Sequence, residues 1–347
     1  MPFVIYWLTG KESTNDMLVL IGKRLGAMVI VLLVLAAVVF GLQHMTPTDP
    51  VHAMLGANAS KAQIAAERHK LGYDQSLPSQ YLHYVAGVSH GNLQMSLRTR
   101  RPVMTDLRAY LPATAELAVY GLAMAVVLGG LLGIAGSARF RGSGVFRSVM
   151  AAGASMPPFL LALLGLLLFY RRLGWLPATG RTSIANHPTG PTGFLTFDGL
   201  LHGRFDVVWD ALRHLALPAF CIAILPAVSI GRVLRSSLVG TMRSDYVRTA
   251  RAKGLRDFSV LRKHGLRNSV GPALSMAGLQ VGLMFAGVVV VEQIFAWPGI
   301  GLYTVQSIPR TDFPAIAGVT LVLGAIYVIV NTVVDILQAV ADPRIAL

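Results

Sequence analysis

The sequence is poor in charge and in cysteine, and it lacks the common motifs of hydrolytic chemistry. Charged residues make up only 13% of its 347 residues, whereas soluble domains carry about 25%. The one cysteine, Cys221, excludes an intramolecular disulfide and a multi-cysteine metal site. The phosphate-binding pattern G-x-x-x-x-G-K-[ST] is absent, as are H-E-x-x-H and G-x-S-x-G. We therefore expect no catalytic residues, no metal site and no ATPase motif in this chain.

Long apolar runs take the place of the missing charge. Hydrophobic residues make up 54% of the chain, and a membrane-spanning helix needs roughly 20 of them in succession. This favours an all-α polytopic membrane protein over a nucleic-acid-binding one, despite the net charge of +14. The first run is too long for a cleaved signal peptide, so we expect it to be retained. Six spans are predicted: Leu25–Leu42, Ala115–Ala135, Val149–Tyr170, Leu215–Ile230, Pro272–Val291 and Pro314–Val340.

Two of these spans contain prolines. The fourth is the weakest of the six, because it is short and broken by Pro218 and Pro226. Met156-Pro157-Pro158 predicts a kink in the third. Glu116, at the outer start of the second span, is predicted to be an interfacial residue.

The distribution of Lys and Arg predicts the orientation of the spans. Short cytoplasmic loops carry an excess of these residues. Arg139, Arg141 and Arg147 crowd the short second loop, and the fourth loop is strongly basic. Both loops should face the cytoplasm, which places both termini there as well.

The most basic stretch of the fourth loop is Asp245–Asn268, with eight Lys, Arg or His residues and two acids. Its pattern predicts two short helices at an angle, with a break at Gly254, because glycine disfavours a helix interior. One interpretation is an amphipathic segment on anionic lipid, where each basic residue contributes about 1 kcal/mol. The small residues around Gly254 and the break between the helices favour a docking element for a soluble partner.

Several segments resemble one family of transport proteins. "YVRTARAKGL" (Tyr246–Leu255) is similar to the cytoplasmic EAA loop of ABC importer permeases of the dipeptide/oligopeptide class, and "LRNSVGPALS" (Leu266–Ser275) resembles its exit. "VEQIFAWPGIG" (Val291–Gly301) and "VNTVVDILQAVADPR" (Val330–Arg344) resemble later family segments. "LGYDQSLPSQY" (Leu71–Tyr81), "LPATAEL" and "GWLPATG" resemble outer-loop segments, so the likeness covers nearly the whole chain.

The resemblance implies a type I ABC importer permease fold with cytoplasmic coupling helices, in a bacterial inner membrane. It implies a permease subunit for peptides or similar small solutes that works with four kinds of partner: a second homologous permease, two ATP-binding subunits, an extracytoplasmic solute-binding protein and membrane lipid. ATP and Mg would bind the partner ATPase subunits, and no cofactor would bind this chain. The alternative is a secondary transporter or channel subunit that ATP does not drive. The implied organisation is a cytoplasmic lead (1–16), a first span (17–45), an extracytoplasmic loop (46–111) and a permease core (112–347) with a coupling loop (241–269).

Three groups of site residues are predicted. Tyr327, Asn331 and Asp335 recur at helical spacing in the last span, so they are predicted to line the path or contact the partner permease, with packing inside the bundle as the alternative. Glu292 and Trp297 follow the fifth span and are predicted to form an outer gate or a binding-protein contact, with an interfacial turn as the alternative. The resemblance assigns ATPase coupling to Tyr246, Arg248, Thr249, Ala250, Arg251, Ala252, Lys253, Gly254 and Leu255.

Overall fold

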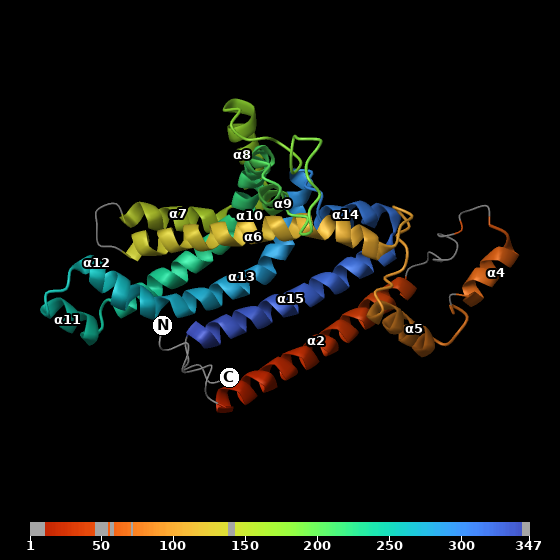
Figure 1. Ribbon diagram of the computed structural model, residues 1–347, viewed down its shortest axis with the longest axis horizontal. Helices are drawn as coiled ribbons and strands as arrows, with labels where there is room; N and C mark the ends of the chain where they lie inside the picture. The colour runs from red at the N-terminus through yellow and green to blue at the C-terminus, as the bar shows by residue number, and fades with distance from the viewer. Residues whose placement is uncertain (1–10, 46–54, 56–58, 71, 138–142, 342–347) are drawn as a thin grey trace. The chain divides into compact units, whose positions relative to one another are not determined.

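The described part of the chain is almost entirely helical. This computed structural model describes residues 11–45, 55, 59–70, 72–137 and 143–341 (Figure 1). Within these ranges the extended pairing is a single isolated bridge between Met95 and Pro102. The predicted all-α fold is therefore confirmed. Most of the predicted lead (1–16), a stretch of the outer loop and the end of the chain lie outside the described residues.

The helices belong to two compact units. Unit 1 comprises Pro112–Gly301 and Ile329–Leu347, together with Met1–Asp16. Unit 2 comprises Met17–Leu111 and Leu302–Val328. Three long helices contribute residues to both: α2 (Lys11–Met45), α6 (Val103–Ser137) and α15 (Phe313–Ala341).

Unit 2 contains most of the first helix, α2 (Lys11–Met45), and the segments that follow it, including α4 (Lys61–Lys70) and α5 (Leu77–Ser89). Its polar centre is Asp312, which is fully buried and lies just before α15. The carboxylate accepts hydrogen bonds from the Ser96 hydroxyl at 2.5 Å and from the Arg98 backbone N–H at 3.0 Å. These bonds tie the outer loop to the turn after α14 (Ile300–Ser307) and the 3₁₀ turn Ile308–Arg310.

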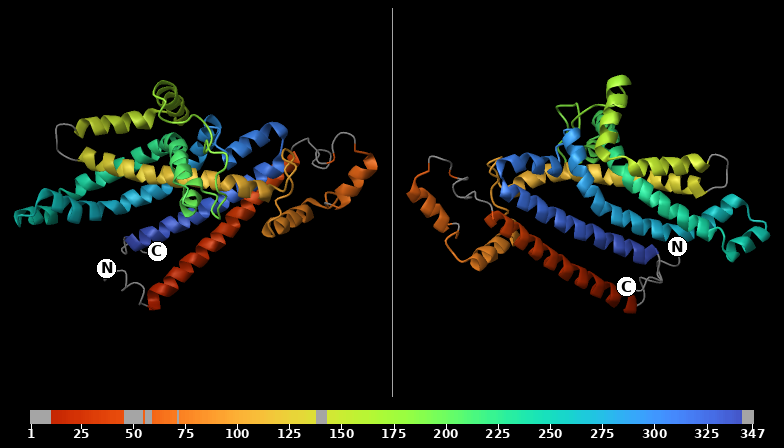
Figure 2. Two further views of the ribbon diagram at one scale, coloured as in Figure 1. Left: turned by 45° about the horizontal axis from the view of Figure 1, so that its top comes forward. Right: turned by 180° about the vertical axis from the view of Figure 1, so that it is seen from behind.

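Unit 1 is arranged around α10 (Phe205–Thr241). This helix packs against α13 (Arg267–Ile294), and the two lie side by side in Figures 1 and 2. It also packs against three shorter helices: α7 (Ser143–Ser155), α8 (Pro158–Gly165) and α9 (Leu195–Leu201). A π-helical turn, Leu166–Arg172, continues α8. Cys221 lies in the core of this unit and is only 1% exposed.

The predicted spans agree with the helices, with one correction. Four described helices are long and apolar enough to cross a membrane, and two bent pairs raise the number to six if each is one span. The predicted kink in the third span is confirmed, because α7 and α8 meet at an angle of 107°. The expectation that the fourth span is short and broken by its prolines is wrong. It is α10, which has 37 residues and continues through Pro218 and Pro226. Neighbouring helices bury 67% of its apolar window and thereby support the backbone that the prolines interrupt.

Glycines bring α6 and α10 close together. A Cβ added at Gly129 would lie 2.7 Å from the Ala227 carbonyl oxygen, and one at Gly133 would lie 2.9 Å from that of Gly231. Small residues of this kind allow the backbones of membrane helices to touch. The α6–α10 contact therefore depends on particular glycines rather than on apolar character alone.

Adjacent glycines of α6 provide a test of this contact. We expect Gly129→Ala to destabilise the protein by about 1–3 kcal/mol, because a fixed backbone oxygen occupies the space of the new methyl group. A Cβ at Gly130 meets nothing within 4 Å, so Gly130→Ala should be neutral or stabilising, by up to about 1 kcal/mol. The measurement is the Tm of each detergent-solubilised variant. Equal shifts at the two positions would contradict the close approach.

Candidate functional site

The predicted coupling loop forms a joint of two short helices between α10 and α13. The first is α11 (Asp245–Ala252) and the second is α12 (Asp257–Val260), which continues through a π-helical turn, Leu261–Leu266, into α13. Both appear in teal beyond the ends of α10 and α13 in Figure 1. We call the segment Asp245–Leu266 the joint.

Gly254 ends α11 by a specific hydrogen-bonded cap. Its φ is +80°, in the left-handed region that residues with a Cβ adopt at a cost of about 1–2 kcal/mol. The Gly254 N–H donates to the Arg251 carbonyl at 2.9 Å, and the Leu255 N–H donates to the Ala250 carbonyl at 3.3 Å. These two bonds form a Schellman motif, which commonly terminates helices at glycine. The break predicted at Gly254 is confirmed, and its local cause is this cap.

The inner side of the joint is apolar. Val247 and Val260 are fully buried, and Ala250 is 6% exposed, so α11 packs directly on α12. Met242, at the end of α10, packs against this cluster. Of the residues predicted for ATPase coupling, Ala250 therefore faces inward. It holds the two helices together and presents little surface to a partner.

The outer side of the joint combines basic and apolar side chains. Tyr246 is 48% exposed and Leu255 38% exposed. The other predicted coupling residues are exposed as well: Arg248, Thr249, Arg251, Ala252, Lys253 and Gly254. Phe258 on α12, which was not among the predicted coupling residues, is 73% exposed. Its position two residues before the buried Val260 could have placed it on the opposite face of the helix.

An exposed ion pair links the two sides of the break. The Arg251 Nε lies 3.2 Å from the Asp257 carboxylate. Exposed pairs contribute little to stability, so the cap and the apolar cluster fix the angle of the joint.

The predicted path residues lie on α15. Tyr327 is 49% exposed, whereas Asn331 is half-buried. Asp335 follows on the same helix, but its side chain lies outside the described part of the structure. Their spacing along one continuous helix keeps the three positions on one face.

Glu292 and Trp297 are core residues. Both side chains are fully buried. The Thr114 hydroxyl donates to the Glu292 carboxylate at 2.6 Å, and the Trp297 indole N–H donates to the Ala113 carbonyl at 2.9 Å. These bonds fasten α6 to the end of α13 and the turn after it. A role as outer gate or binding-protein contact stays a prediction, and neither side chain offers surface to a soluble partner in this conformation.

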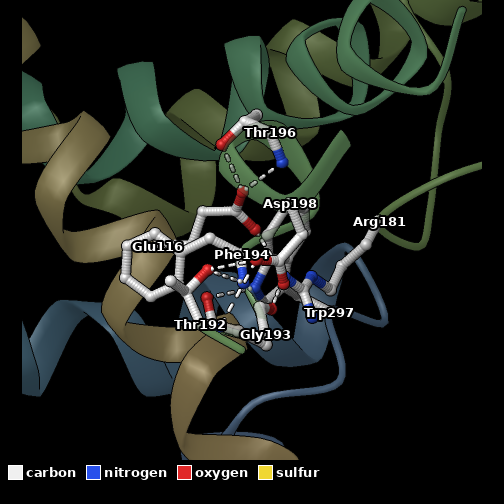
Figure 3. Close-up of polar contacts among 9 residues, drawn as sticks. Glu116, Arg181, Thr192, Gly193, Phe194, Thr196, Asp198 and Trp297 are labelled. Atoms are coloured by element: carbon white, nitrogen blue, oxygen red, sulfur yellow. Dashed lines mark hydrogen bonds and ion pairs between the residues drawn. The ribbon is translucent and has the colours of Figure 1, made fainter. Parts of the chain in front are cut away.

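A buried carboxylate on α6 orders the third outer loop (Figure 3). Glu116 is fully buried and accepts hydrogen bonds from the Thr196 N–H at 2.9 Å and the Thr196 hydroxyl at 2.6 Å. Its other oxygen lies 2.5 Å from the Arg181 guanidinium, which also donates to the Gly193 carbonyl. The same guanidinium lies 5.8 Å from the centre of the Trp297 ring. Glu116 is therefore a core residue, and the expectation of an interfacial one is wrong.

A second acid in this loop is also buried. Asp198, at 1% exposure, accepts hydrogen bonds from the Thr192 hydroxyl at 2.7 Å and the Thr192 N–H at 3.3 Å. These two hydrogen bonds connect the Gly- and Pro-rich segment before α9 to α9 itself.

Comparison with known proteins gives consistent matches along the chain. A family model described as "Binding-protein-dependent transport system inner membrane component" matches residues 125–347, and its N-terminal counterpart matches residues 17–118. The di/tripeptide transport system permease protein DppB of Pseudomonas aeruginosa is 40% identical, over 95% of this chain and 99% of that protein. The dipeptide transport system permease protein DppB of Alkalihalophilus pseudofirmus is 37% identical, over 93% and 98%.

Other matches are more distant. The dipeptide transport system permease protein DppB of Escherichia coli K12 is 35% identical, over 95% of this chain and 99% of that protein. A solved amino acid ABC transporter chain aligns at 14% identity with a TM-score of 0.45, over 76% of this chain and 98% of that chain. The apolar helices and the sequence matches together identify a multi-pass membrane protein, and the chain belongs to the family of binding-protein-dependent transport system inner membrane components.

Proposed function

We propose that this chain is one of two permease subunits of an ATP-driven importer for peptides or similar small solutes. The relatives described above are named as dipeptide or di/tripeptide permeases, and they align with 93–95% of this chain. The observation that carries the proposal is the joint. Its inner side is packed and capped, while its outer side leaves Tyr246, Leu255 and Phe258 exposed among basic residues. Exposed aromatic and basic residues together favour contact with a protein partner.

The joint suits the transmission of movement. Because Val247, Ala250 and Val260 pack together, a force on α11 displaces α12 with it. α12 continues through the π-helical turn into α13, and α13 packs along α10. A displacement of the joint would thus reach the two central helices of unit 1. ATP and Mg would bind the partner subunits, and this chain would supply the moving helices.

The proposed assembly contains a second homologous permease, two ATP-binding subunits and an extracytoplasmic solute-binding protein. The excess of Lys and Arg in the joint favours a cytoplasmic position for it and for both termini. Tyr327, Asn331 and Asp335 would contact the partner permease or line the path. The exposure of Tyr327 favours such a contact.

Reconstitution of the full complex tests this function. We expect proteoliposomes containing all subunits to accumulate a labelled dipeptide only with ATP on the joint side and the binding protein on the other. Omission of this chain should abolish uptake. Uptake driven by an ion gradient without ATP would instead support a secondary transporter, and ATP-binding subunits that fail to co-purify with this chain would contradict the proposal.

A further inference from the structure

A basic hollow lies where the joint meets α13. It is a surface cavity of about 680 Å³ lined by Arg262, Lys263, His264, Arg267 and Asn268. The two arginines, the lysine and the asparagine are exposed, and the histidine is half-buried. No acidic residue lines the hollow. Its chemistry is that of a site for an anion.

The positive charges of the hollow are not neutralised within the described part of the chain. On the neighbouring α11, Arg248 pairs with Asp245, and Arg251 pairs with Asp257. No such pair involves Arg262, Lys263 or Arg267 among the residues that the structure describes. The hollow thus gathers, within six residues, three of the cations that no described acid pairs; Lys253 and Arg256, nearer Gly254, are two others.

The spacing between the hollow and the predicted fifth span matches the thickness of the lipid headgroup layer. Arg267 precedes the apolar run that begins at Pro272 by five residues, a rise of about 7.5 Å along a helix. The polar layer on each side of a bilayer is roughly 5–8 Å thick. Along α13, Val270 and Leu274 follow Arg267 at i+3 and i+7, and Val270 is 38% exposed. A basic surface thus passes directly into an apolar one on the same face of the helix.

We infer that this hollow binds the phosphate of an anionic phospholipid, with the acyl chains along α13. Arginine forks and a lysine ammonium match the acceptor oxygens of a phosphodiester, and the Asn268 amide adds a neutral donor. An acidic surface of a protein partner would match the charges but not the adjoining apolar face. The spacing from the fifth span and this apolar continuation favour a lipid over a soluble anion.

The site also touches the first helix of the joint. The Asn268 amide donates to the Tyr246 hydroxyl at 3.4 Å, and the Tyr246 and His264 rings lie 6.3 Å apart. A lipid in the hollow would therefore contact residues that hold α11 in place. This consequence rests on the proposed function, whereas lipid binding itself does not.

The test is a lipid titration of the purified full-length chain by native mass spectrometry. We expect phosphatidylglycerol to bind at least tenfold more tightly than phosphatidylcholine, because each basic residue near an anionic headgroup contributes about a factor of five. The triple variant Arg262→Gln, Lys263→Gln, Arg267→Gln should lose this preference. Inorganic phosphate at millimolar concentration should not displace the lipid.

The matched control removes the same charge from the other end of the joint. The triple variant Arg248→Gln, Arg251→Gln, Lys253→Gln should keep the preference for phosphatidylglycerol. Arg267→Lys, which retains the charge but loses the guanidinium fork, should keep a preference for phosphatidylglycerol that is weaker than the parent's. Equal loss in both triple variants would indicate a general charge effect and overturn the proposal. Displacement of the lipid by inorganic phosphate would also overturn the proposal. The same holds if the hollow variant still binds the lipid but no longer co-purifies with the ATP-binding subunits.

Discussion

Gly254→Trp should abolish ATP-driven uptake while ATP hydrolysis by the assembled complex continues. Two effects combine in this variant. The left-handed φ of +80° is strained by about 1–2 kcal/mol for a residue with a Cβ. A Cβ at this position faces open space, into which the indole would project. The open position is where the proposed partner would approach. Uptake and hydrolysis are measured in parallel in proteoliposomes.

Two smaller substitutions separate the effect of backbone strain at Gly254 from the effect of side-chain size. Gly254→Asn should retain at least half of the uptake, because asparagine tolerates the left-handed region at a helix end. The uptake of Gly254→Ala should be lower than that of Gly254→Asn and higher than that of Gly254→Trp. Gly240→Trp is the matched control, since Gly240 is exposed on α10 and nothing lies within 4 Å of an added Cβ there. Normal uptake by Gly254→Trp, or equal loss in Gly240→Trp, would remove the coupling role from Gly254.

Arg181→Met should destabilise the protein by about 3–5 kcal/mol, because it leaves the buried Glu116 carboxylate without its cation. Glu116→Gln should also destabilise it, though less, since Arg181 retains slight exposure and the amide oxygen can still accept from Thr196. The double variant should be more stable than the sum of the single effects predicts. Neither charge is then left unpaired. Thermal unfolding in detergent measures all three.

An exposed pair at the start of α10 provides the contrast. Arg204 and Asp206 form an ion pair at 2.8 Å with both side chains largely exposed. Asp206→Asn should nevertheless leave the Tm unchanged, because solvent screens the pair. Two results would contradict the assignment of a buried pair. One is additive effects on the Tm of the Glu116 and Arg181 substitutions; the other is a decrease in Tm for Asp206→Asn as large as theirs.

Features set by nearby residues could be predicted from the sequence. The apolar runs that predict the spans are continuous, and the break at Gly254 depends on the few residues around the glycine. The kink at Met156-Pro157-Pro158 is equally local, because proline removes a donor and clashes with the preceding turn. These features require no knowledge of what packs against them.

Features set by distant residues could not be predicted in this way. Glu116 is paired with Arg181 and accepts hydrogen bonds from Thr196, which are 65 and 80 positions away. Nothing near Glu116 in the sequence distinguishes it from an interfacial acid. The prolines of α10 similarly led to the expectation of a short, broken span, although neighbouring helices stabilise a continuous helix there. Burial of a polar or helix-breaking residue depends on tertiary contacts that a local pattern does not contain.

The position of Cys221 has a practical consequence for spectroscopy. It is the single thiol of the sequence, and it is enclosed in the core of unit 1 at 1% exposure. A cysteine introduced at an exposed position such as Phe258 would be the thiol that a dye or spin label reaches in the folded protein. The native chain thus already serves as a background for distance measurements between labelled sites, with no substitution in its core.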